Sequence, residues 1–194
     1  MRHIASVCLG LCLLALTCAP SGAAGPKPVV VLDTSLGQVW LMLEPEAAPA
    51  TVENFLGYVQ SGFYDGTVFH RVIRGFMAQG GGFDMAMVRR DTNAPVKNEA
   101  YNGLGNERGT IAMARTQDPH SATSQFFINY KDNAFLDYKS KTSQGWGYCV
   151  FGKVVRGMDV VDSMAEVPTT SKGMMQDVPS TPIIIKRAYV HDGQ

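Results

Sequence analysis

The main chemical feature of this sequence is Arg71, a cation inside the otherwise apolar stretch Phe69–Ile73. Aromatic and β-branched residues make this stretch a predicted strand. Because side chains alternate between the two faces of a strand, Arg71 should point away from His70 and Val72, the natural core positions. A guanidinium on a rigid sheet face offers non-covalent chemistry: positive charge and hydrogen bonds to a bound group.

A second extended piece follows a turn and adds apolar surface and one amide close to that cation, from Phe76, Met77 and Gln79. It ends in three glycines, which suggests a phosphate-binding loop. Such a loop needs Gly-Lys-Ser/Thr at the start of a helix, whereas a Phe-Asp pair follows here. We therefore predict close backbone packing at the glycines, and no nucleotide binding.

No residue pattern supports covalent or metal chemistry. A hydrolase needs a nucleophile with a base, or two carboxylates that flank a bond. Three histidines lie beyond the N-terminal apolar segment, His70, His120 and His191, and none has a convincing partner pattern. Neither an H-x-x-x-H nor a C-x-x-C pair is present to bind a metal. We expect neither a metal nor a cofactor.

Residues 1–24 have the features of a cleaved secretory signal. A basic start precedes an apolar run over 4–19, and small residues follow at 21–24. The run is shorter than the ~20 residues that span a bilayer. We expect a periplasmic protein whose mature chain begins near Gly25. An uncleaved anchor and a lipoprotein, with Cys18 as its lipidated residue, are the alternatives.

The composition of the rest indicates one ordinary domain over 25–194. Loss of the signal leaves Cys149 as the only cysteine, so no internal disulfide forms. The whole chain has 17 basic and 17 acidic residues, and loss of Arg2 makes the remainder slightly acidic. This balance attracts neither nucleic acid nor an anionic membrane. No repeat or heptad pattern indicates a second domain, and we expect a monomer.

Strand patterns predominate and must position Arg71. Segments 28–34 and 38–44 flank a short turn and predict a hairpin. Segment 47–60 has apolar residues at i, i+3, i+4 and i+7, which predicts an amphipathic helix, and a second helix is expected at 157–166. Further strands are expected at 109–115, 124–129, 148–155 and from Ile183 onward, with irregular segments over 84–106 and around Pro168 and Pro179.

Alternation assigns faces on two of these strands. Cys149 and Phe151 should face the core, while Tyr148 and Val150 face the other way. If Phe126 is a core residue, its neighbour Phe127 is an exposed aromatic.

Four blocks, F-H-R-V-I-R-G-F-M-A-Q-G-G-G, G-T-I-A-M-A, S-Q-F-F-I and V-F-G-K, occur in an order and spacing that resemble the cyclophilin family of peptidyl-prolyl cis-trans isomerases. The resemblance covers about Val29 to Val190 and is strongest to secreted bacterial members. It implies a mainly β fold: a closed eight-stranded antiparallel barrel capped by two α-helices, with an active groove on its outer surface.

The resemblance further implies that Arg71 is catalytic and that the groove binds proline-containing peptides. Rotation of an X-Pro amide meets a barrier of ~18–20 kcal/mol. A guanidinium favours the twisted amide, whose nitrogen lone pair is the better acceptor, and no nucleophile is needed. The implied proline pocket and peptide-binding residues are Phe76, Met77, Gln79, Ala114, Arg115, Gln125, Phe127, Phe135, Leu136 and Tyr148.

Two groove positions depart from the eukaryotic pattern, with Phe135 in place of a tryptophan and Tyr148 in place of a histidine. Because Phe135 lacks an indole N–H donor, cyclosporin should bind weakly. The expected partners are unfolded or exported polypeptides that contain proline, whose folding the enzyme would assist. The alternative is a non-catalytic client-binding or chaperone module that uses the same groove.

Overall fold

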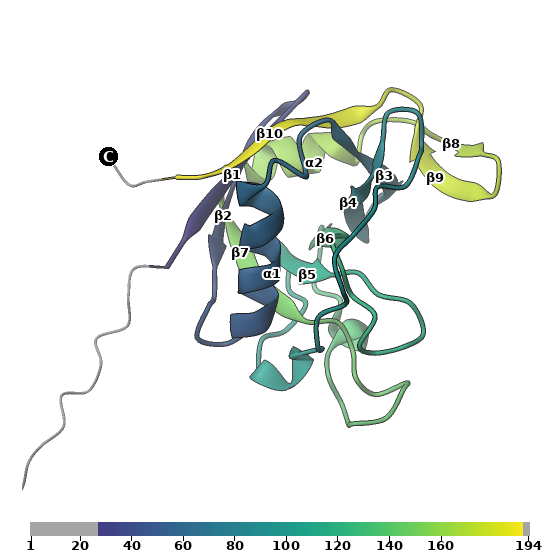
Figure 1. Ribbon diagram of the computed structural model, residues 1–194. Helices are drawn as coiled ribbons and strands as arrows, with labels where there is room; N and C mark the ends of the chain where they lie inside the picture. Colours follow the sequence, from purple (N-terminus) through teal and green to yellow (C-terminus); the bar gives the residue numbers. More distant parts are fainter. Residues whose placement is uncertain (1–26, 192–194) are drawn as a thin grey trace, which may run out of the picture.

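Eight antiparallel strands close into a barrel in the computed structural model, which describes residues 27–191 (Figure 1). Around the barrel the strands follow the order β1-β10-β3-β4-β6-β5-β7-β2. Their bounds are β1 (Val29–Thr34), β2 (Gly37–Leu43), β3 (Thr67–Ile73), β4 (Met77–Asp84), β5 (Thr110–Met113), β6 (Phe126–Asn129), β7 (Val150–Arg156) and β10 (Ile183–Val190). The predicted barrel is confirmed, whereas the expected signal at 1–24 lies outside the described residues.

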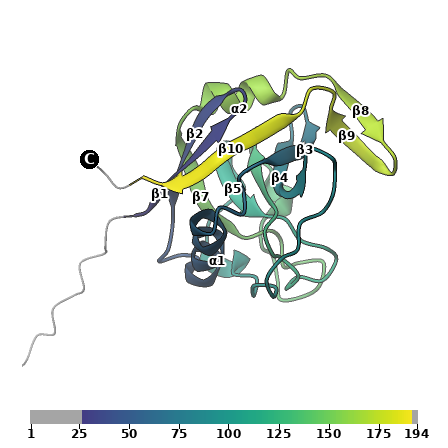
Figure 2. The ribbon, with the colours of Figure 1, turned by 45° about the horizontal axis from the view of Figure 1, so that its top comes forward.

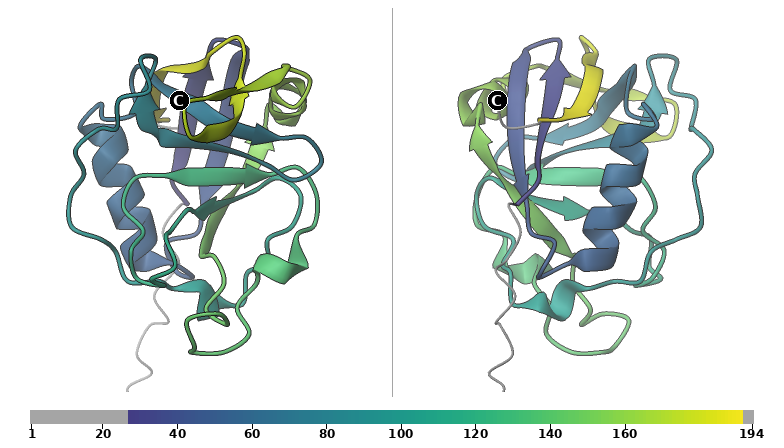
Figure 3. Two further views of the ribbon diagram at one scale, coloured as in Figure 1. Left: turned by 90° about the vertical axis from the view of Figure 1, so that its right-hand side faces the viewer. Right: turned by 60° about the vertical axis from the view of Figure 1, so that its left-hand side comes forward.

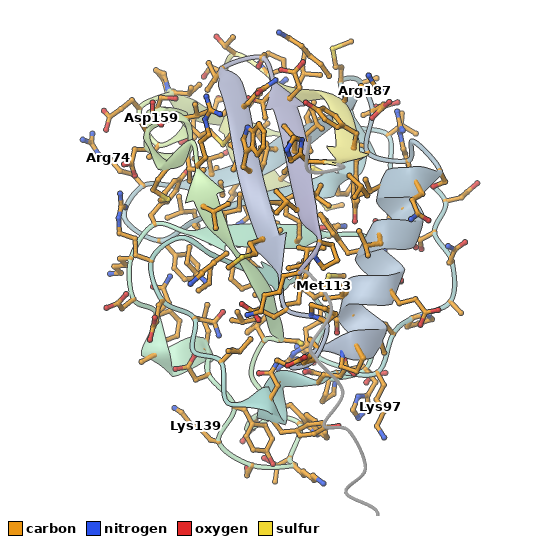
Figure 4. All side chains as sticks on the ribbon, turned by 90° about the vertical axis from the view of Figure 1, so that its left-hand side faces the viewer. Arg74, Lys97, Met113, Lys139, Asp159 and Arg187 are labelled. Carbon is orange, nitrogen blue, oxygen red and sulfur yellow. The ribbon has the colours of Figure 1, made fainter. Side chains whose placement is uncertain are left out.

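Two helices cover the barrel on opposite sides, α1 (Pro49–Gln60) and α2 (Met158–Met164) (Figures 2 and 3). From α1, Phe55 enters the interior, where its ring centroid lies 5.7 Å from that of Phe126 and 5.1 Å from that of Phe151. Side chains fill the space between these elements (Figure 4). Within residues 27–191 neither helix is long and apolar enough to cross a membrane.

The irregular segment 84–106 supplies the cap of α1, whose own N-cap residue makes no side-chain hydrogen bond. The Glu99 carboxylate accepts hydrogen bonds from the Ala50 N–H (3.2 Å) and from the N–H (2.9 Å) and hydroxyl (2.8 Å) of Thr51. A carboxylate satisfies the free N–H groups and complements the positive end of the helix dipole. Segment 84–106, in which the short 3-10 helix η1 (Ala100–Asn102) is the one helical element, is thereby tied to the barrel.

Strand β3 departs from simple alternation. Its pairing with β4 shifts register between Phe69 and Arg71, and both Phe69 and Val72 enter the core. His70 is buried outside that core, with its ring centroid 4.6 Å from that of Phe83, and burial lowers its pKa to about 4. The expectation that His70 shares a core face with Val72 is therefore wrong, because a bulge adds a residue to the strand.

A hairpin replaces the irregular segment expected around Pro168 and Pro179. Strands β8 (Thr169–Lys172) and β9 (Met175–Pro179) pair with each other only and project from the barrel beside β3 (Figures 1 and 2). All four β8 side chains are exposed, so β8 has no alternating burial pattern. Sequence periodicity therefore gave no signal for it.

The thiol of Cys149 should be unreactive in the folded protein. The side chain is buried in the core with Phe151, as predicted, and burial raises the pKa of the thiol to about 11. The reactive thiolate is therefore scarce at neutral pH. In protein that starts at Gly25, a colorimetric thiol reagent at pH 8 should label Cys149 only after denaturant is added. Rapid labelling of the native protein would contradict the burial.

Candidate functional site

A second apolar cluster lies on the outer face of the barrel, on the side of the sheet opposite the core. Alternation along β6 explains the division: Phe126 belongs to the inner core and Phe127 to this outer cluster. The short 3-10 helix η2 (Ala134–Leu136) adds to it. The buried members of the outer cluster are Met77, Ala112, Phe127, Leu136 and Val150.

Phe127 forms the floor of this surface. The expectation that it is exposed is wrong, since only 4% of its surface is accessible. The Tyr148 ring meets it edge-on, with 5.6 Å between centroids, and Leu136 packs in the same cluster. Neighbouring side chains cover Phe127 even though it faces outward.

Strand register joins Arg71 to this cluster. Arg71 pairs with Gln79 on β4, Gln79 with Phe127 on β6, Phe127 with Ala112 on β5, and Ala112 with Val150 on β7. Directly paired residues have Cβ atoms about 4.5–5.5 Å apart. The predicted cation, amide and aromatic ring are therefore consecutive members of one row across the outer face.

The Arg71 side chain has free donors. It is 42% exposed, and its Nε lies 3.7 Å from a carboxylate oxygen of Asp177. Residues 27–191 provide no hydrogen-bond acceptor for its guanidinium within hydrogen-bonding geometry. Nothing in the sequence pointed to Asp177, because the hairpin that carries it was not predicted.

The predicted glutamines form a pair. The Gln79 amide donates to the side-chain oxygen of Gln125 over 2.9 Å. A Cβ on Gly82 would lie 2.5 Å from the Gln125 side chain, and one on Gly81, whose φ is +79°, would lie 2.8 Å from the Phe126 ring. These contacts confirm that the glycines serve close packing. The side chain that packs against the Gly82 backbone is that of Gln125, a predicted site residue.

Two phenylalanines form one rim of the surface. The rings of Phe76 and Phe135 stack, with centroids 5.7 Å apart and planes 24° apart. Phe135, in η2, is 62% exposed. Both predicted residues therefore lie beside the outer cluster, with Phe135 the more accessible.

The other rim is polar and includes Arg115. Its Nε donates to the Gly147 carbonyl (2.8 Å), and its guanidinium lies 4.7 Å from the centroid of the Tyr148 ring. Arg115 and Tyr148 border an open depression of about 700 Å³, together with Thr116, Gln117, Ser143 and Gln144. Sequence reasoning missed these last four residues, for which polar loop composition was the only signal.

Backbone at Ala114 has less to offer a peptide than expected. Its N–H already donates to the Gln125 carbonyl over 2.9 Å. Only the carbonyl of Ala114 remains to bind a ligand.

This arrangement can perform non-covalent chemistry. Arg71 offers donors, the outer cluster offers an apolar floor, and the glutamines offer amides. The Cys149 thiol faces the core and His70 is buried apart from the outer cluster, so neither reaches this surface. Residues 27–191 contain no group of three or more His, Cys, Asp or Glu side chains arranged to hold a metal ion.

Comparison with known proteins identifies the family. The family model described as cyclophilin type peptidyl-prolyl cis-trans isomerase/CLD matches residues 29–190. A peptidyl-prolyl cis-trans isomerase of Streptomyces antibioticus is 59% identical over 161 residues, which cover 83% of this chain and 97% of the relative. Peptidyl-prolyl cis-trans isomerase A of Dickeya dadantii is 53% identical over 189 residues, 97% of each chain.

A solved structure supports the same family. The crystal structure of a Cryptosporidium parvum cyclophilin type peptidyl-prolyl cis-trans isomerase in the presence of the dipeptide Ala-Pro superposes with a TM-score of 0.70 at 28% identity. The superposition covers 85% of this chain and 99% of that one. The chain therefore belongs to the family of cyclophilin-type peptidyl-prolyl cis-trans isomerases.

Proposed function

We propose that this peptidyl-prolyl cis-trans isomerase acts through Arg71, with the proline ring of its substrate bound on the outer cluster. The observation that carries the proposal is the row in which Arg71, Gln79 and Phe127 are cross-strand neighbours. Arg71 and Phe127 both pair with Gln79, which lies between them. The Arg71 donors and the apolar floor are therefore close enough to contact the nitrogen and the ring of one proline at the same time.

The chemistry follows from the electronic structure of the amide. Rotation breaks the conjugation between the prolyl nitrogen and the preceding carbonyl, and the nitrogen lone pair then becomes a better acceptor. A hydrogen bond from Arg71 to that nitrogen therefore strengthens as the bond twists, which lowers the barrier and not merely the energy of the bound substrate. A charge-assisted hydrogen bond worth ~1.5–3 kcal/mol corresponds to a roughly ten- to hundredfold rate increase.

The remaining groups hold the peptide while the bond rotates. Burial of the proline ring against Phe127 and Met77 fixes one side of the X-Pro bond. The Gln79–Gln125 pair and the Ala114 carbonyl can hydrogen-bond the peptide backbone. The depression beside Arg115 and Tyr148, about 700 Å³ in volume, can hold residues that flank the proline.

A protease-free exchange assay tests the activity. Addition of the protein to a short X-Pro peptide should accelerate cis-trans exchange measured by NMR, where the uncatalysed process takes tens to hundreds of seconds. A protein that binds unfolded polypeptides without accelerating this exchange would support the alternative, a client-binding or chaperone module.

We further propose that the chain is exported, acts as a monomer and assists the folding of exported proteins. The pattern over 1–24 supports export, since a basic start, an apolar run and small residues occur in order. Intact-mass measurement on a periplasmic fraction should find a chain that begins near Gly25, and a variant without 1–24 should stay in the cytoplasm. Retention of 1–24 in a membrane pellet would favour the uncleaved anchor.

Cyclosporin should bind weakly to the unmodified protein. Phe135 is exposed on the rim and has no N–H to donate, so a tryptophan there would add a donor. Calorimetry should find that Phe135→Trp binds cyclosporin more tightly, while peptide turnover changes less. A tryptophan at the exposed position Leu36, in the turn between β1 and β2, is the control and should change neither. Tight binding by the unmodified protein would contradict the inference.

A further inference from the structure

We propose that Asp177 is a positioning residue, which orients the Arg71 guanidinium for catalysis; this inference rests on the role proposed for Arg71. Asp177 is the only acidic residue within 4 Å of the Arg71 guanidinium in the described part of the chain, at 3.7 Å from Nε. The two residues come from different units of the fold, Arg71 from the barrel strand β3 and Asp177 from the projecting hairpin.

The hairpin is built to present this carboxylate. Asp177 has a φ of +59°, a left-handed conformation that few residue types other than glycine adopt readily. It also lies where the β8–β9 pairing shifts register, between the pairs of Thr170 with Val178 and Lys172 with Met175. A bulge re-aims side chains, and here it gives Asp177 an orientation that regular pairing would not.

The base of the hairpin holds the Asp177 backbone in place. Asp177 is followed directly by Val178 and Pro179, both buried, which pack with Val68 and His70 of β3. Met174 at the tip is fully exposed, so the anchored part of the hairpin is the part next to Asp177. The carboxylate is thus presented from a fixed backbone, which lowers the entropy cost of keeping it near Arg71.

The geometry of the pair suits positioning. An arginine side chain loses rotamer entropy when it is fixed, and Arg71 has no hydrogen bond within the described residues that would fix it. Attraction at Nε restrains one edge of the guanidinium and leaves the two terminal nitrogens for a substrate. At 3.7 Å the contact exceeds hydrogen-bond length, so the guanidinium can still adjust to a bound peptide.

Two other roles for the pair predict different results. If Asp177 merely attached the hairpin to the barrel, its loss would lower stability and leave turnover unchanged. If Asp177 weakened Arg71 by partly neutralising its charge, its loss would increase turnover. Only the positioning role predicts that loss of Asp177 lowers kcat, and that it does so only when Arg71 is present.

Asp177→Asn is the decisive variant, because asparagine keeps the size of the side chain and tolerates a positive φ while it removes the charge. We expect kcat for a short X-Pro peptide to fall roughly two- to fivefold, with little change in KM. This is the change in rate that corresponds to the free energy of one exposed ion pair. In the Arg71→Ala background the same substitution should cause no further loss. Glu166→Gln is the matched control: it removes the carboxylate 3.0 Å from Arg74, an arginine close to Arg71 in sequence but outside the row, and turnover should not change.

An NMR measurement reports the contact without relying on activity. The Arg71 Nε–Hε resonance, identified by its loss in Arg71→Lys, should shift in Asp177→Asn and stay in place in Glu166→Gln. An inactive unmodified protein would overturn the proposed function and this inference together. In an active protein, an unshifted resonance, an unchanged or higher kcat in Asp177→Asn, or an equal fractional loss without Arg71 would overturn this inference alone.

Discussion

Replacement of Arg71 by alanine should reduce kcat/KM for a short X-Pro peptide at least ten- to a hundredfold, the value of one charge-assisted hydrogen bond made in the transition state. The loss should appear mainly in kcat, because the bond to the prolyl nitrogen strengthens only as the amide twists. Protease-free NMR exchange rates over a range of peptide concentrations separate kcat from KM.

Stability should change little in the same variant. Arg71 is 42% exposed and its one ion pair is long, so the free energy of unfolding should fall by no more than about 1 kcal/mol. Arg71→Lys should restore little activity, because an ammonium on a flexible stem lacks the planar fork of donors. Thermal melts of the three proteins check that each is folded.

Arg74→Ala is the matched control for Arg71→Ala. Arg74 follows β3 directly, and its exposed side chain extends from the edge of the molecule (Figure 4). Its removal takes away an equal charge without touching the row formed by Arg71, Gln79 and Phe127, so turnover should be unchanged. Full activity in a folded Arg71→Ala protein, or an equal loss in Arg74→Ala, would exclude Arg71 from the mechanism.

Local alternation made much of this site predictable. At the start of β7 and in the two residues before it, alternation correctly divided Cys149, which faces the core, from Tyr148 and Val150, which face the outer cluster. It also placed Arg71 on the outside of β3. A period of two needs only neighbouring residues, so the sequence of one strand is enough to reveal it.

Features that depend on distant partners were not predictable. The bulge in β3 puts Phe69 in the core and His70 outside it, and it arises in the pairing of β3 with β4. The Arg71–Asp177 contact requires a hairpin whose β8 strand has no buried face. The burial of Phe127 depends on Tyr148 and Leu136, from other parts of the chain. These outcomes are set by register and packing between elements, which one strand's pattern does not contain.

Phe127→Ala should combine a large loss of stability with a large loss of activity. The ring is 4% exposed and lies edge-on to Tyr148, and truncation of a buried phenylalanine typically costs about 3–5 kcal/mol. Loss of the apolar floor also removes the contact proposed for the proline ring. Apolar burial worth about 1.5–3 kcal/mol corresponds to a decrease in kcat/KM of roughly ten- to a hundredfold. Chemical denaturation and peptide exchange, both at 10 °C, measure the two effects.

The adjacent residue on β6 separates the two causes. Ile128 faces the core and is fully buried, so Ile128→Ala should cost a comparable amount, about 2–5 kcal/mol, while it leaves the outer cluster intact. At a temperature where both variants remain folded, Ile128→Ala should retain its turnover and Phe127→Ala should not. Phe127→Leu, which keeps apolar bulk without the ring, should fall between Phe127→Ala and the unmodified protein in both measurements. If Phe127→Ala is destabilised but turns over peptide normally, Phe127 only packs between Tyr148 and Leu136, and the proline ring must bind elsewhere on the surface.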